Sequence, residues 1–209
     1  SPVWMTRPVE DDVAATWKTA GGHILGAGAA LLFALPLVRV FINSGVAFNS
    51  SDLPSMPLTL AEGAAELAGS GWPLVAPWIG ALGAFLAGSN TISNLTFSLF
   101  QFSTAEQIGA NPEVIVAAQA VGGAAGNMVT IHNVVAASAT VGLLGREGDL
   151  IRKTVLPASY YCLTAGGIAY VWTYGFGFNS GTILLAGIVA GIAGLAGEQL
   201  RHADALDGL

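Results

Sequence analysis

Apolar residues gather along the chain in long runs that are separated by short polar segments. A helix that spans a membrane needs about 20 consecutive, mostly apolar residues. Three runs are near or above this length and predict continuous transmembrane helices at residues 20–43, 154–173 and 182–198. Polar residues predict the segments around them as a loop or a short surface helix at 1–19, a charged loop at 146–153 and a tail at 199–209.

Residues 58–69 have a helical pattern but are too few to cross a membrane. Apolar residues such as Leu58 and Ala61 recur at helical spacing, while Glu62 and Glu66 lie on another side. A short amphipathic helix of this kind lies in the plane of the membrane surface. We therefore expect an interfacial helix at 58–69.

A further apolar stretch is interrupted by a polar segment. Residues 72–88 are apolar for about 17 residues, which is marginal for a full crossing. The polar run 89–94 follows, and a second short apolar arm then leads to Phe102. Two short arms around a polar tip predict a re-entrant helical hairpin over residues 72–108.

The last stretch, residues 112–145, is interrupted near its middle. Glycines and an asparagine at 122–127 precede the polar residues Thr130, His132 and Asn133. This pattern predicts one transmembrane helix that unwinds within the membrane. Together the segments predict an all-α fold, namely a polytopic transmembrane helical bundle with a re-entrant hairpin and a broken helix.

Positively charged residues predict the orientation of these segments. Arg146, Arg152 and Lys153 lie close together, and loops rich in Lys and Arg remain on the cytoplasmic side of a membrane. The loop 146–153 is therefore predicted to be cytoplasmic. The hairpin then enters and leaves the membrane from the outer side.

The two interruptions predict a ligand site between them. Backbone groups that unwind at membrane depth lose their partners at a cost of several kcal/mol each, unless they face a cavity or other protein. Each interruption also starts a new half-helix, whose amino terminus stabilises an anion by about 0.3–1 kcal/mol. We expect Ser89, Asn90 and Thr91 to cap one half-helix, and Asn127 and Thr130 to cap the other.

The candidate substrate-binding residues are Ser89, Asn90, Thr91, Ser93, Asn94, Gly126, Asn127, Thr130, His132 and Asn133. The alternative interpretation is that they are ordinary polar turn residues buried against other helices. His132 is also the candidate for carrying a coupled proton, because histidine changes charge near neutral pH. The competing interpretation of His132 is a neutral side chain that is hydrogen-bonded across helices.

Composition supports a membrane protein and excludes several other classes. Hydrophobic residues make up 53% of the chain and charged residues 10%, whereas soluble domains have about a quarter charged residues. The mean hydropathy is +0.64. No basic stripe is present to bind nucleic acid, and the single Cys162 provides neither a disulfide framework nor a CxxC pair. Motifs for phosphate binding, metal binding or nucleophilic catalysis are absent from the sequence, so we expect no cofactor, no metal and no enzyme.

Several local motifs resemble the L-lactate permease family. They are Ser89-Asn90-Thr91, Gly126-Asn127-Met128, the run from His132 to Ala136, and Gly145-Arg146-Glu147-Gly148. The resemblance implies proton-coupled uptake of L-lactate and related 2-hydroxy monocarboxylates such as glycolate, across a bacterial inner membrane. It also implies the lipid bilayer and the N-terminal half of the same transporter as partners.

The family is similar to a broader group of ion transporters that are built from two inverted repeats. In that group each repeat has a hairpin and a broken helix, and Ser-Asn-Thr tips hold the carboxylate or, in sodium-driven members, the cation. One such repeat is visible here, and the chain starts at Ser1 without an initiator methionine. We therefore expect a carboxy-terminal fragment, and a homo-oligomer remains open.

Three other functions remain open at this point. The first is a sodium-coupled carrier of dicarboxylates or other organic anions with the same fold. The second is a membrane-embedded enzyme that uses His132 as a base, which would need a second acid or a metal ligand within the membrane. The third is a non-catalytic membrane subunit.

Overall fold

The structure, a computed structural model, describes residues 9–143 and 145–207, and all regular structure in this part of the chain is helical. The predicted all-α fold is confirmed. The helices are α1 (Val9–Ile42), α2 (Met56–Ala68), the 3-10 turn η2 (Gly69–Gly71), α3 (Trp72–Ala87), α4 (Asn90–Gln107), α5 (Pro112–Gly126), α6 (Ile131–Thr140), α7 (Glu147–Tyr174) and α8 (Ser180–Asp207).

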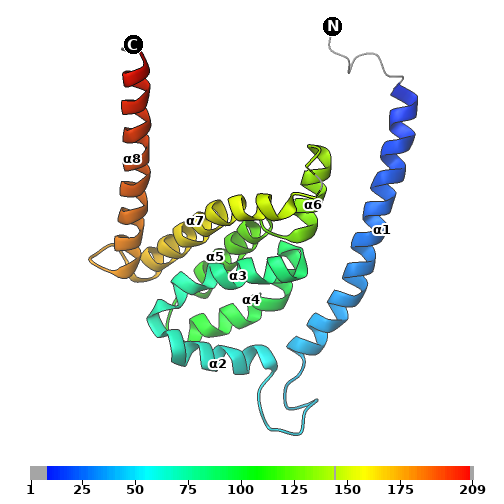
Figure 1. Cartoon of the computed structure of the whole chain (residues 1–209). Helices are drawn as coiled ribbons and strands as arrows, with labels where there is room; N and C mark the ends of the chain where they lie inside the picture. Colours follow the sequence, from blue (N-terminus) through cyan, green and yellow to red (C-terminus); the bar gives the residue numbers. More distant parts are fainter. Residues whose placement is uncertain (1–8, 144, 208–209) are drawn as a thin grey trace.

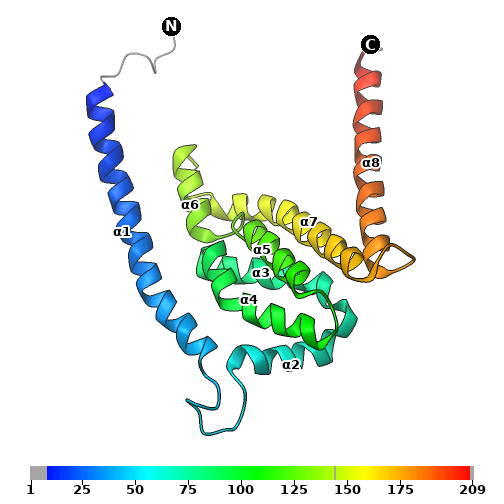
Figure 2. The same ribbon diagram turned by 180° about the vertical axis from the view of Figure 1, so that it is seen from behind.

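Helices α3, α4, α5 and α7 form a central bundle. Helix α3 packs against the other three, and α2 packs along α4 (Figures 1 and 2). Helices α1 and α8 extend from opposite flanks of this bundle in the same direction (Figure 1). The buried core joins α2, α3, α4 and the start of α5, and in it Trp72 meets Phe100 edge-on with ring centroids 5.4 Å apart.

Local sequence explains where the central helices begin and end. The side-chain oxygen of Asn111 caps α5, because it accepts hydrogen bonds from the N–H groups of Glu113 and Val114 at 2.9 and 3.2 Å. Pro112 then occupies the first turn, where a helix needs no N–H donor. Gly88 ends α3 with φ 74°, a left-handed conformation that favours glycine.

Two polar segments that we expected to be irregular are largely helical, and the segment 1–19, expected as a loop or a short surface helix, is helical from Val9. The first eight residues of the segment 1–19 lie outside the described part of the chain. Helix α7 begins at Glu147, inside the expected charged loop, and α8 continues to Asp207 through the expected tail. The reason is that polar side chains tolerate a helix well, whereas Gly and Pro end one. In α7 the first turn also contains acidic residues, which the helix dipole stabilises.

Two helical stretches of the described residues are long and apolar enough to cross a membrane, Met56–Ala87 and Ser180–Glu198. Helices α5 and α6 add a third if this bent pair forms one span. Gly69 has φ 48° and ψ −130°, so the first stretch consists of two helices, α2 and α3. The expected spans 20–43 and 154–173 are outside this set and remain predictions. Proline and several tyrosines lower the hydropathy of the second one.

Candidate functional site

The break between α3 and α4 lies beside the break between α5 and α6. At the second break, the Thr130 hydroxyl donates to the carbonyl oxygen of Ala84 in the last turn of α3, at 3.3 Å. The His132 imidazole lies directly against Gly88, where an added Cβ would overlap the ring. Helices α5 and α6 are bent by 45° at residues 127–130. The two polar interruptions of the sequence therefore meet in space.

The first break is shorter than expected. It consists of Gly88 and Ser89, because the other polar residues of the expected tip, 90–94, form the first turn of α4. Ser89 caps this helix, since its hydroxyl oxygen accepts a hydrogen bond from the Ile92 N–H at 3.4 Å. Thr91 is exposed in the same turn. The first N–H groups of a helix have no partner within it, so the amino terminus of α4 is presented at the break.

Asn90 is turned toward α5. Its side-chain oxygen accepts a hydrogen bond from the Asn94 amide at 3.1 Å and lies against Gly123, where any side chain would overlap it. The side-chain oxygen of Asn94 is buried and finds no donor within the described chain. A buried acceptor without a partner costs about 1–3 kcal/mol. A ligand or water at this oxygen would therefore be stabilised.

The second break is a turn that follows α5. The Asn127 N–H donates to the Gly123 carbonyl at 3.3 Å, and the Val129 N–H donates to the Gly126 carbonyl at 3.1 Å. From α6, the Asn133 amide donates to the Asn127 carbonyl at 3.3 Å and closes the turn. The side-chain oxygen of Asn127 is buried and, among residues 9–143 and 145–207, has no donor. One buried amide oxygen without a donor among the described residues therefore lies near each break, that of Asn94 in α4 and that of Asn127 in the second break.

Three of the expected binding residues have packing contacts at the breaks. The Ser93 hydroxyl donates to the Gly80 carbonyl at 2.9 Å and accepts from Gln119 at 3.2 Å. Thr130 was expected to cap α6 with its side chain, and this prediction was wrong, because its hydroxyl donates to two carbonyl oxygens of the preceding helices. Gly126 lies against the backbone of α3, where a side chain would not fit.

His132 is exposed on the surface of this chain, in the first turn of α6. The sequence pattern predicts that His132 lies well inside the membrane. The competing interpretation was that the His132 side chain is hydrogen-bonded across helices. Within the part of the chain that the structure describes, its imidazole has no such hydrogen bond. Its ring instead covers the Gly88 turn. His132 is therefore positioned at both breaks and remains accessible to a ligand.

Sequence reasoning missed a buried polar network in the same bundle. The Trp72 indole donates to Gln101, and Gln101 donates to Gln119, each at 2.8 Å. Both glutamines are 0% exposed. The available signal was an isolated amide within each of two otherwise apolar runs.

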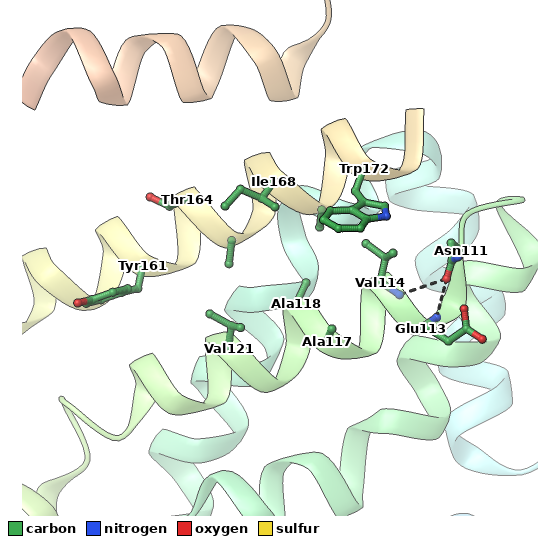
Figure 3. A pocket seen from close by; sticks show the side chains of 12 residues that line it. Asn111, Glu113, Val114, Ala117, Ala118, Val121, Tyr161, Thr164, Ile168 and Trp172 are labelled. Atoms are coloured by element: carbon green, nitrogen blue, oxygen red, sulfur yellow. Dashed lines mark hydrogen bonds between the residues drawn. The ribbon is translucent and has the colours of Figure 1, made fainter. Parts of the chain in front are cut away.

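A groove of about 650 Å³ lies between α5 and α7 (Figure 3). Apolar side chains such as Val114, Val121 and Ile168 line it, and Trp172 lies near Val114 at one end. None of the candidate binding residues contributes to its lining. A site for a small hydrophilic ligand needs convergent polar groups, whereas mainly apolar side chains line this groove.

The model of the L-lactate permease family matches residues 3–175. The chain belongs to the L-lactate permease family. Together with its apolar helices, this membership identifies a membrane protein.

Named relatives are permeases. The L-lactate permease of Salmonella typhimurium is 39% identical over 147 residues, which are 68% of this chain and 26% of that protein. The L-lactate permease of Escherichia coli K12 is 38% identical over 147 residues, which are 68% of this chain and 26% of that protein. The glycolate permease of Escherichia coli K12 is 38% identical over 112 residues, which are 53% of this chain and 20% of that protein. The chain thus spans about a quarter of the length of the two lactate permeases. No solved structure matches it.

Proposed function

We propose that the chain is the carboxy-terminal part of a secondary transporter that takes up L-lactate and related 2-hydroxy monocarboxylates such as glycolate, together with protons. The observation that carries this proposal is the meeting of two helix breaks, each of which leads into a helix amino terminus. The buried, unpaired oxygens of Asn94 and Asn127 near the breaks are acceptors for the 2-hydroxyl group rather than for the carboxylate. Family membership supplies the substrate class. The protein would lie in the bacterial inner membrane, with several crossings.

The amino termini of α4 and α6 would hold the carboxylate. Their free N–H groups and dipoles stabilise an anion by about 0.3–1 kcal/mol each, and by more when water is excluded. The amide groups of Asn90 and Asn127 would hydrogen-bond the 2-hydroxyl group and one carboxylate oxygen. Because Ser93 and Thr130 join the breaks to neighbouring helices, they would hold this site in shape rather than contact the substrate.

The remaining parts of the transporter complete this proposal. Helices α3 and α4 would form a re-entrant hairpin, and α5 with α6 a broken transmembrane helix, so that the chain contributes one of two inverted repeats. The N-terminal half of the transporter would supply the other repeat and close the site from the opposite side. The lipid bilayer would cover the exposed apolar faces of α1 and α8.

Removal of either amide at the breaks is expected to impair uptake. Asn90→Ala and Asn127→Ala each remove one hydrogen bond to a charged or polar ligand, which lowers kcat/KM for L-lactate about tenfold or more. The measurement is uptake of labelled L-lactate by vesicles that contain the full-length permease. Asn43→Ala is the matched control, because among the described residues the side chain of the exposed Asn43 bonds only the nearby Arg39 carbonyl. Unchanged uptake in both test variants would show that the substrate does not bind at Asn90 and Asn127.

His132 is expected to couple uptake to protons. In His132→Gln, uptake driven by a proton gradient should fall to the background, because glutamine cannot carry a proton. Exchange of labelled for unlabelled lactate, which needs no net proton movement, should continue. Equal loss of both reactions would show that His132 acts in binding or folding and not in coupling.

Coupling to sodium is the second candidate, and the two unpaired oxygens of Asn94 and Asn127 favour it. Hard cations bind amide and carbonyl oxygens. A sodium-driven carrier would lose uptake when choline replaces sodium, and a dicarboxylate carrier would be inhibited by succinate. A proton-driven lactate permease would show neither response.

A further inference from the structure

A continuous series of hydrogen bonds runs through the buried centre of the bundle. The Trp72 indole donates to Gln101 at 2.8 Å, and Gln101 donates to Gln119 at 2.8 Å. Gln119 donates to the Ser93 hydroxyl at 3.2 Å, which donates to the Gly80 carbonyl at 2.9 Å. All four bonds point in the same direction, so each one polarises and strengthens the next.

The series of hydrogen bonds joins three helices and fixes their positions along one another. Gln119 belongs to α5, Ser93 and Gln101 belong to α4, and the two ends lie on α3. The three polar side chains between the ends are at most 1% exposed. Gly83 leaves room for the Ser93 hydroxyl, because a Cβ there would overlap it. Sliding α4 along α5 would break at least two of these bonds in a place that water does not reach.

Gln119 is linked to the candidate site along both helices, α4 and α5. Its partner Ser93 is one helical turn after Asn90, and Gly123, which contacts the Asn90 side chain, is one turn after Gln119. The bond between Gln119 and Ser93 therefore determines where the amino terminus of α4 stands relative to the end of α5. That end leads directly into Asn127.

We infer that Gln119 is a positioning residue, which holds the register of α4 against α5 so that the two helix amino termini converge on one anion. This inference rests on the proposed function for the identity of the anion, but the register itself does not depend on it. Gln119 touches no substrate. It acts through Ser93 and thereby keeps the hairpin and the broken helix together as one unit.

A distance measurement tests the register without any substrate. Nitroxide labels are placed at Thr91→Cys in α4 and Ile131→Cys in α6, both of which are exposed, in full-length permease without other reactive cysteines. Gln119→Leu should shift or broaden the distance distribution between the labels. Ser93→Ala removes the same bond with a smaller change and should act alike, which preserves the test if Gln119→Leu does not fold.

Thr104→Val is the matched control. Thr104 also has a buried hydroxyl in α4, but within the part of the chain that the structure describes its side chain bonds only the Phe100 carbonyl of its own helix. Thr104→Val should therefore leave the distance between the two labels unchanged. Label distances that are also unchanged in Gln119→Leu and Ser93→Ala would overturn the inference, whatever happens to uptake.

Uptake by the unlabelled variants separates this inference from the proposed function. Gln119→Leu should raise the KM for L-lactate about tenfold, because small misplacements of binding groups are costly. Changed label distances together with an unchanged KM would support the positioning role and contradict the anion site proposed above. Changed label distances together with a raised KM for L-lactate would support both the positioning role of Gln119 and the proposed anion site.

Discussion

Gly122→Ala is expected to remove most of the folded permease from the membrane. Gly122 lies on α5 where this helix crosses α3, and a Cβ there would overlap the carbonyl group of Pro77. The obstacle is backbone inside a helix, so no side-chain rotation relieves it. Small residues allow this close approach of helices in membranes. Forcing the pair apart should cost about 3 kcal/mol or more, a large part of the usual total stability.

The measurement for Gly122→Ala is the yield of monodisperse protein after detergent extraction, with its midpoint of thermal unfolding. Gly63→Ala is the control, because Gly63 is also a helical glycine and a Cβ there meets nothing within 4 Å. That change should be neutral or slightly stabilising, since alanine favours a helix more than glycine does. Equal yields and midpoints for both variants would show that α3 and α5 are not packed as described.

Gly88→Ala is expected to abolish most lactate uptake while the protein remains folded. Two effects act at this position. The φ of 74° is strained for alanine by about 1–2 kcal/mol. In addition, a Cβ would overlap the His132 imidazole, so the ring must leave the turn between α3 and α4. Because His132 is a flexible side chain, the fold survives, but the site loses its arrangement and uptake falls about tenfold or more.

Gly109→Ala separates the two effects. Gly109 has a φ of 70°, and a Cβ there meets nothing within 4 Å, so this variant carries the backbone strain without the contact. Both variants should lose similar stability, and only Gly88→Ala should lose uptake. If the two variants transported lactate equally well, contact between His132 and the Gly88 turn would have no role in transport.

Several structural features could be predicted because they depend on a few neighbouring residues. The end of α3 follows from the left-handed glycine, and the start of α4 follows from the capping serine that comes next. The start of α5 follows in the same way from Asn111 and Pro112. The first turn of α7 was missed because polarity was read as irregular structure, although a helix accepts polar residues readily.

The roles of polar side chains within the bundle could not be predicted in this way. Ser93 and Thr130 look like ligand groups in the sequence, but their hydroxyl groups are used by carbonyl oxygens of other helices. Gln101 and Gln119 look like isolated polar residues, and they are joined only because α4 packs on α5. Such partners are far apart along the chain, so a local pattern contains no information about them.

By itself, the sequence determined an all-helical membrane protein of the L-lactate permease family, with two polar interruptions among its apolar runs. Only the tertiary structure decided that these interruptions meet, that Asn94 and Asn127 keep an unpaired oxygen there, and that Gln119 links the helices behind them. The physical reason is one of range. Apolar runs, caps and glycine turns act over a few residues, whereas hydrogen bonds between helices depend on how closely the glycine faces allow those helices to pack.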